Sequence, residues 1–308
     1  MSQIDDLLSY LRNQVGKPYV LGAIGPNEFD CSGLTYAAFK EVTSLEIPRV
    51  SSDQFGAGKK VDESDIKEGD LVFFDTGWSK RKPNHLGVCI GNGNMINANS
   101  YYSDVHEESY LSAYWSSKFM GARRIIGVES SFKDLFVEDI FFSFVSDLYD
   151  RGVVEGYPVV GAEKPEFKPD GDINRAEILK IILLAFNIPI KESGSLTFPD
   201  VKDTDWFFKY VLTAFENSII DGYPDGSFGP ANSINRVEAL KMILEAAKVD
   251  LSVSLSTNFD DVKEADWFYK YVAYAYDKYL ISPQSETYYG CAENMSRGEV
   301  CMTISKLI

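Results

Sequence analysis

The 308-residue sequence has little of what several protein classes require. It contains only four cysteines and two histidines. Four cysteines are too few for a disulfide scaffold in a chain this long, and none combines with histidine at zinc-site spacing. No apolar run approaches the roughly 20 residues that a transmembrane helix needs. No signal peptide is visible at the start, so we expect either a mature or trimmed form or a protein that stays inside the cell.

Positive charge is also scarce. Lys and Arg number 30 against 46 Asp and Glu, for a net charge of −16. Residues 1–128 carry 13 basic and 16 acidic residues, a balance of −3, whereas residues 129–308 carry 17 and 30, a balance of −13. Because nucleic-acid binding needs clustered cations, we expect no nucleic-acid partner. The length fits two domains, and the 45% of apolar residues can fill a core in each.

Residues 1–128 predict a domain of mixed helices and strands. Apolar residues recur with a helical period over residues 3–16 and again from residue 31 onward. Strand-like stretches separated by turns rich in glycine and asparagine follow at residues 70–76, 85–93, 94–100 and 121–128. Helices followed by strands indicate an α+β domain.

Cys31 stands at the start of the second predicted helix, in the stretch NEFDCSGLTYAAF. Asp30 and Ser32 beside it are residue types that favour helix starts. The helix dipole and the unpaired backbone amides at such a position stabilise an anion, so we expect a lowered pKa for the Cys31 thiol. The alternative is a buried structural cysteine, because cysteine is among the most buried residue types.

A thiol nucleophile needs a base, and two histidines make the search short. His85 opens a predicted strand, and Asn97 follows 12 residues later on the next strand, after a glycine-rich turn. Strand alternation puts both side chains on the same side, where Asn97 would orient the His85 ring. Cys31, His85 and Asn97 therefore form a candidate Cys–His–polar catalytic group. We interpret His106 as a surface residue of a polar loop.

Residues 129–308 contain three copies of one pattern. Each copy reads as a helix, a loop and a second helix, and we place the copies at residues 132–192, 198–250 and 259–308. Trp206 and Trp267 are 61 residues apart, and we expect them in the core rather than stacked on sugars. Such repeats bury their apolar faces on one another, so we predict an all-α unit of pseudo-threefold arrangement. The predicted domains are therefore 1–128 and 129–308.

An arginine recurs at the start of the second helix of each copy, as Arg175, Arg236 and Arg297. The helix dipole disfavours a cation there, so either an anionic ligand or an ion pair at the helix end is expected to hold it. With Gly156 and Gly222 in neighbouring Gly-Tyr-Pro turns, these arginines could clamp a negatively charged sugar. The third copy lacks this turn, and we expect its groove to be weak or silent.

Three motifs of the first half together resemble a known family. The stretches GKPYVLGAIGPNEFDCSGL, EGDLVFF and HLGVCIGNGNMINAN resemble the NlpC-type papain-like cell-wall peptidases over nearly all of residues 1–125. The resemblance implies a papain-like fold with Cys31 as nucleophile, His85 as general base and Asn97 at the third position. It also implies cleavage of peptidoglycan stem peptides, typically after γ-linked D-glutamate. No metal or other cofactor is expected.

The same resemblance implies a set of substrate contacts. Tyr19 would lie at the active site, where its hydroxyl helps to hold the oxyanion or the substrate, and Asp30 and Ser32 would contact the substrate. The sequence departs from the family at the third position, which is usually histidine and here is Asn97, and at Gly22-Ala23, where the family has two glycines. Two alternatives stay open: an inactive wall-binding or scaffold protein, and an amidase or acyltransferase of the same fold.

The second half resembles surface-layer homology (SLH) repeats over its full length, on the motifs DWFFKYV, GYPDGSFGP and INRVEALKMI. This resemblance implies binding to an acidic secondary cell-wall polysaccharide. The two halves together therefore predict an exported cysteine peptidase held at the cell wall or cell surface by its repeats.

Overall fold

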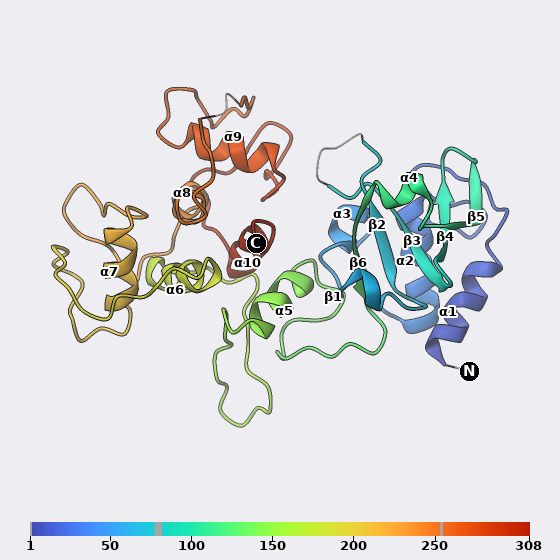
Figure 1. The fold of residues 1–308 in the computed structure, drawn as a ribbon, viewed down its shortest axis with the longest axis horizontal. Coiled ribbons are helices and arrows are strands. Elements are labelled where there is room, and N and C mark those ends of the chain that lie inside the picture. Colours follow the sequence, from blue (N-terminus) through green and yellow to red (C-terminus); the bar gives the residue numbers. More distant parts are fainter. Residues whose placement is uncertain (1, 78–81, 253–254) are drawn as a thin grey trace. The chain divides into compact units, whose positions relative to one another are not determined.

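The computed structural model describes residues 2–77, 82–252 and 255–308, and the chain forms two compact units (Figure 1). The first unit comprises Met1–Asp147 and Gly156–Phe167, and the second comprises Leu148–Glu155 and Lys168–Ile308. The predicted domain boundary after residue 128 stays a prediction.

The first unit is built around a six-stranded antiparallel sheet in the order β1-β6-β2-β3-β4-β5 (Figure 1). Its strands are β1 (Lys59–Val61), β2 (Leu71–Phe74), β3 (His85–Gly91), β4 (Asn94–Asn99), β5 (Asp104–Ser109) and β6 (Phe119–Arg124). Its helices include α1 (Gln3–Arg12), α2 (Cys31–Thr43), α3 (Ser51–Gln54) and α4 (Ala113–Ser116). The α+β prediction is confirmed, although β1 and β5 were not among the predicted strands.

Both faces of the sheet are buried, because alternate side chains of β2 enter different cores. Leu71 and Phe73 pack with apolar residues of α1 and α2, whereas Val72 and Phe74 pack with Trp115 of α4 on the other face. The strand β3 runs through the middle of this arrangement, so its side chains are shielded along nearly their whole length. Polar groups at its start therefore lie in a largely dry environment.

A segment beyond residue 128 completes the first unit. The Gly58 N–H donates to the Val137 carbonyl at 2.7 Å, and the Ser143 N–H donates to the Gly56 carbonyl at 2.8 Å. A Cβ atom at Gly56 would lie 1.9 Å from the carbonyl oxygen of Ile140, so the two backbones approach as closely as glycine allows. Val137 also packs against the apolar core beneath α2.

We therefore expect a fragment of residues 1–128 to be less stable than one of residues 1–147. The shorter fragment loses the two backbone hydrogen bonds and the Val137 contact, which together are worth about 2–4 kcal/mol in the free energy of unfolding. Urea denaturation of both fragments measures the difference. Equal midpoints and equal slopes would show that the segment contributes nothing to the stability of the sheet domain.

Each sequence copy in the second half contains a pair of helices. The pairs are α5 (Phe142–Asp150) with α6 (Arg175–Ala185), α7 (Phe208–Glu216) with α8 (Arg236–Ala246), and α9 (Tyr269–Asp277) with α10 (Arg297–Ser305). The helical nature of this half is thus confirmed. Across the described residues, no helix combines the length and the apolarity that crossing a membrane would require.

Backbone bridges connect the three copies one to the next within the second unit. They pair Asn174 with Ser233, Asn235 with Asn294, and Ser296 with Asp172. The first bridge joins copy one to copy two, the second joins copy two to copy three, and the third returns from copy three to copy one. The segments just before α6, α8 and α10 are therefore tied to one another in a closed cycle.

Candidate active site

The thiol of the candidate nucleophile lies at the first residue of a helix, as predicted. Cys31 begins α2, and Asp30 caps this helix by accepting a hydrogen bond from the Gly33 N–H at 2.6 Å. A Cβ atom at Gly33 would lie 2.0 Å from the Ala23 carbonyl oxygen, so the preceding loop packs directly on the helix start. Glycine at position 33 is thus a condition for the loop and the helix to meet beside Cys31.

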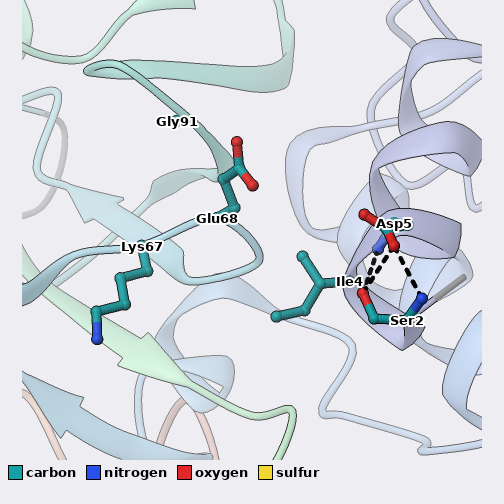
Figure 2. A pocket seen from close by; sticks show the side chains of 6 residues that line it. All are labelled: Ser2, Ile4, Asp5, Lys67, Glu68 and Gly91. Atoms are coloured by element: carbon teal, nitrogen blue, oxygen red, sulfur yellow. Dashed lines mark hydrogen bonds between the residues drawn. The ribbon is translucent and has the colours of Figure 1, made fainter.

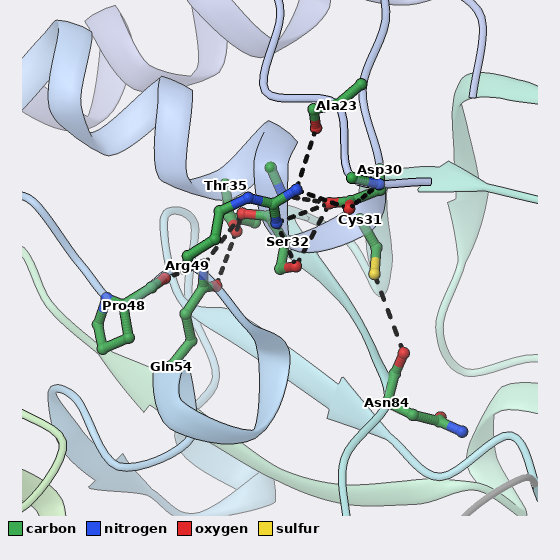
Figure 3. A network of polar contacts seen from close by, with 11 residues as sticks. Ala23, Asp30, Cys31, Ser32, Thr35, Pro48, Arg49, Gln54 and Asn84 are labelled. Atoms are coloured by element: carbon green, nitrogen blue, oxygen red, sulfur yellow. Dashed lines mark hydrogen bonds and ion pairs between the residues drawn. The ribbon is translucent and has the colours of Figure 1, made fainter. Parts of the chain in front are cut away.

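Asp30 is also the centre of a buried ion-pair network (Figure 3). Arg49 donates from Nη1 to Asp30 Oδ1 at 3.0 Å and from Nη2 to Asp30 Oδ2 at 2.7 Å, and its Nη1 also contacts Ser32 Oγ at 3.0 Å. Burial alone would raise the pKa of Asp30, but Arg49 and the backbone amides of Gly33 and Gly22 outweigh it and lower the pKa. The predicted substrate contacts Asp30 and Ser32 are therefore both engaged by Arg49.

The thiol itself is held close to the start of β3. The distance from Cys31 Sγ to the carbonyl oxygen of Asn84 is 3.9 Å (Figure 3). The Leu86 N–H also faces the sulfur. Burial, and after it the Asp30 carboxylate, raises the pKa of Cys31 to about 11, against the amides that would lower it. The expected lowering of this pKa is therefore wrong, because desolvation of a buried thiolate exceeds the stabilisation from the helix start.

His85 and Asn97 meet as the strand pattern predicts. His85 Nε2 lies 2.9 Å from Asn97 Oδ1, and both side chains are buried. Gly87 stands between them in the sheet, where a Cβ atom would come within 3.1 Å of the Asn97 Cβ. A side chain at position 87 would therefore crowd Asn97 on the neighbouring strand.

Aromatic rings enclose the candidate base. The Trp115 ring stacks on His85 with centroids 4.9 Å apart and an interplanar angle of 17°, and Phe74 lies 6.3 Å away. Burial lowers the pKa of His85 to about 4, although the Asn97 hydrogen bond and the Glu108 charge both act to raise it. At neutral pH both the thiol and the imidazole are therefore uncharged.

Tyr19 packs against the apolar core that includes Cys31, and its role at the active site stays a prediction. Its hydroxyl group has a raised pKa because of burial and because of the neighbouring Cys31 and Asp30. The Tyr19 backbone N–H donates to the Ser103 carbonyl at 2.9 Å, which ties this segment to the turn before β5. The hydroxyl therefore stays protonated at neutral pH and can donate a hydrogen bond.

The interpretation of His106 as a surface loop residue is wrong. His106 lies on β5 directly opposite Asn97, with a side chain that is only 18% exposed. Its ring nitrogens contact Asp104 at 3.1 Å and Glu108 at 3.0 Å. The sequence reading missed this strand because DVHEES is polar at most positions, yet the spacing of His106 and Glu108 by two residues is the signal of a shared strand face.

The recurring arginines are buried in the second unit. Arg236 is fully buried, and its Nη1 lies 2.5 Å from Glu299 Oε1, while Arg175 Nη1 lies 3.3 Å from Glu238 Oε2. Each glutamate is the third residue of the second helix in the next copy. Its backbone N–H donates a hydrogen bond to the side chain that caps that helix. Arg297 donates to the Glu155 carbonyl oxygen at 2.5 Å. This burial favours the ion-pair interpretation for Arg236.

One pocket of about 310 Å³ lies among the repeats, lined in part by Arg175, Gly222, Tyr223, Lys241 and Trp267. The Arg175 guanidinium lies 4.4 Å from the centre of the Tyr223 ring. Trp267 is 54% exposed, and so the expectation that it lies in the core is wrong.

The counterpart Trp206 is 55% exposed, so its expected core position is wrong as well. Gly222 has a φ of +79°, and a Cβ atom there would meet the Phe198 ring at 2.4 Å. Gly156 belongs to the first unit, where a Cβ atom would meet Pro165 at 2.7 Å. Both glycines thus allow close packing of their turns.

A second pocket lies beside α1 and contains none of the predicted site residues (Figure 2). It is lined by Ser2, Ile4, Asp5, Lys67, Glu68 and Gly91. The polar groups of Ser2 and Asp5 bond to each other in the capping box of α1. These groups are therefore used in starting the helix.

The two halves of the chain match different families. Residues 16–124 match the NlpC/P60 family, and residues 131–179, 197–240 and 258–301 match the S-layer homology domain. The chain therefore contains an NlpC/P60 domain followed by three S-layer homology repeats. Both resemblances seen in the sequence are confirmed.

Individual relatives are similar to this chain over the length of its first domain. The murein DD-endopeptidase MepH of Escherichia coli (strain K12) is 35% identical over 122 residues, which are 39% of this chain and 45% of the relative. The gamma-DL-glutamyl hydrolase of Bacillus subtilis (strain 168) is 40% identical over 112 residues, which are 36% of this chain and 26% of the relative. A crystal structure of an NlpC/P60 family protein from Bacillus cereus has 32% identity and a TM-score of 0.38, covering 39% of each chain. The chain thus spans less than half the length of these relatives.

The raised pKa of Cys31 predicts how the thiol reacts. Because the thiolate forms only toward a pH of about 11, alkylation of Cys31 by iodoacetamide should rise about tenfold per pH unit from neutral to alkaline pH. Mass spectrometry of the Cys31 peptide measures this rate, with Cys31→Ser as the control. A rate that is already constant at neutral pH would mean a preformed thiolate and contradict this environment.

Proposed function

We propose that the NlpC/P60 domain is a cysteine endopeptidase that cleaves the stem peptides of peptidoglycan, with Cys31 as nucleophile, His85 as base and Asn97 as the orienting group. The observation that carries this proposal is the 2.9 Å contact between His85 Nε2 and Asn97 Oδ1, next to Asn84, whose carbonyl oxygen lies 3.9 Å from the thiol at the start of α2. The activities by which the relatives are named, a murein endopeptidase and a glutamyl hydrolase, support the substrate class. Cleavage after γ-linked D-glutamate is the finer form of the proposal.

The proposed reaction starts from an uncharged Cys31 thiol and an uncharged His85 imidazole. The thiol proton moves to His85 as the sulfur attacks the carbonyl carbon, so charge appears only during the reaction. The backbone amides at the start of α2 and the Tyr19 hydroxyl would hold the oxyanion. The imidazolium then gives its proton to the leaving amine, and a water molecule activated by His85 hydrolyses the thioester and restores the thiol.

Substitution of Cys31 tests the nucleophile. Cys31→Ala should abolish stem-peptide cleavage while the domain stays folded, because only the attacking atom is lost. Asn97→Ala should lower turnover less severely, since nucleophile and base remain. The measurement is mass spectrometry of muropeptides after incubation with purified sacculi.

The neutral thiol also keeps the inactive wall-binding alternative in consideration, and the same experiment separates the two. Cleavage by the wild-type protein that disappears in Cys31→Ala supports the peptidase. Full cleavage by Cys31→Ala would refute the assignment of Cys31, and no cleavage by the wild-type protein would favour a binding role. Products that carry a new acyl group would indicate an acyltransferase.

We further propose that the three repeats anchor the protein to an acidic polysaccharide at the cell wall or cell surface after export. The pocket with Arg175, Lys241 and Trp267 supports this proposal, because it places an exposed ring beside the glycine turn at Gly222, next to two cations that pair with the lining carboxylates Glu238 and Asp221. The closed cycle of bridges between the copies supports a pseudo-threefold arrangement of the repeats. A site at Arg236 or Arg297 stays a prediction, and neither residue lines this pocket.

The two exposed tryptophans provide a matched test of wall binding. Trp267→Ala should weaken binding to isolated walls roughly tenfold, because a central aromatic contact of a binding site is commonly worth more than 1 kcal/mol. Trp206→Ala removes an equally exposed ring that does not line the pocket, so affinity should stay unchanged. Cosedimentation with wall preparations measures both, and equal losses would exclude this pocket as the site.

Arg236→Ala separates anchoring from folding. This variant leaves Glu299 without its buried partner, so it should lower the free energy of unfolding by roughly 3–5 kcal/mol while the remaining folded protein binds walls normally. Thermal denaturation and cosedimentation are measured on the same sample. A variant with normal stability and lost binding would restore Arg236 as a ligand residue.

A further inference from the structure

Glu108 gathers more hydrogen bonds than any role in packing alone would need. Its Oε1 accepts from Asn97 Nδ2 at 3.0 Å and Asn99 Nδ2 at 3.2 Å, and it lies 3.0 Å from His106 Nε2. Its Oε2 accepts from the indole nitrogen of Trp115 at 2.8 Å. The carboxylate thus lies directly behind the candidate orienting group and touches the ring that stacks on the candidate base.

The position of this carboxylate decides which way the Asn97 amide points. An ionised carboxylate only accepts hydrogen bonds, so the NH₂ group of Asn97 must face Glu108. The amide oxygen must then face His85, and an oxygen can only accept. His85 therefore carries its proton on Nε2 and keeps the lone pair of Nδ1 for proton transfer.

Glu108 also supplies the negative charge that asparagine lacks. Burial alone would raise the pKa of Glu108, but hydrogen bonds from Trp115, Asn97 and Asn99 outweigh it and lower the pKa, so the group is ionised at neutral pH. Its charge acts to raise the pKa of His85. Glu108 therefore stabilises the imidazolium that forms during the reaction, although Asn97 stands between the carboxylate and the His85 ring.

We propose that Glu108 is a positioning residue of the candidate active site, which fixes the Nε2–H tautomer of His85 through Asn97 and stabilises the protonated ring. This inference rests on the proposed peptidase function. The charged and polar groups that face Glu108 are Asn97 and Asn99 from β4, Trp115 from α4 and His106 from β5, with Asp104 on the far nitrogen of His106.

The first test needs no catalysis, so it remains informative even if the protein cleaves nothing. With only two histidines, ¹⁵N NMR of the histidine-labelled full chain resolves the tautomer and titration of His85. In Glu108→Gln the Nε2–H tautomer should lose its dominance, and His85 should gain its proton at a lower pH than in the wild-type chain. Glu107→Gln is the matched control, since it removes the same charge from an exposed neighbour.

The outcome that would overturn the proposal is a His85 spectrum and titration in Glu108→Gln identical to those of the wild-type chain. A change of equal size in Glu107→Gln would also overturn it, because the effect would then reflect net charge. Thermal midpoints of all variants show whether the comparison is made between folded proteins.

The second test uses turnover. Glu108→Gln should lower kcat roughly 10- to 100-fold with little change in KM, because the base is misoriented while the substrate still binds. The acid limb of the pH profile should move to lower pH, since a less basic His85 stays neutral further into acid. Glu107→Gln should match the wild-type protein in both measurements.

A double variant distinguishes positioning from simple structural support. Asn97→Asp combined with Glu108→Gln places the negative charge next to His85, and the amide at position 108 can donate a hydrogen bond to the carboxylate at position 97. We therefore expect kcat to recover at least partly from the Glu108→Gln level. Asn97→Asp alone sets two carboxylates face to face and should lower turnover. A double variant no better than Glu108→Gln, at normal thermal midpoint, would refute the proposed action of Glu108 on His85 through position 97.

Discussion

The candidate site depends on the hydrogen bonds and the ion pair that the Asp30 carboxylate makes. This carboxylate caps α2 through the Gly33 N–H, accepts from the Gly22 N–H at 2.7 Å, and pairs with both terminal nitrogens of Arg49. These partners come from the helix, the loop before it and the segment after it. One buried charge therefore fixes the three pieces of chain that surround Cys31, and it is itself compensated by a full set of donors.

Two polar networks support the candidate catalytic residues, one centred on Asp30 beside Cys31 and one on Glu108 behind Asn97. The Asp30–Arg49 network determines where the thiol lies, and the Glu108 network determines how the imidazole is oriented. Between them both reacting groups are neutral, since burial opposes the charged form of the thiol and of the imidazole alike. In the proposed mechanism such a site keeps its charges in the supporting residues, where hydrogen bonds compensate them, and charge develops at Cys31 and His85 only when a substrate is present.

The sequence predicted the parts of this site that follow from periodicity. The helix that begins at Cys31 and the meeting of His85 with Asn97 need only a helix cap and strand alternation. Glu108 was not predictable in the same way, because β5 shows little hydrophobic alternation. The direction of the thiol pKa depends on whether desolvation or the helix dipole is larger, and this comparison requires the burial of Cys31. The exposure of Trp267 was not predictable, because a tryptophan in a repeated motif has the same sequence pattern whether its side chain packs in the core or lines a pocket.

The cycle of bridges among the repeats has a consequence for how such a unit can change. In an open stack, a copy can be added or removed at an end at the cost of one contact surface. Here the segments before α6, α8 and α10 pair in a closed circuit, so every copy has two neighbours and none is terminal. Inserting a further copy between two neighbours would therefore require one existing pairing to open.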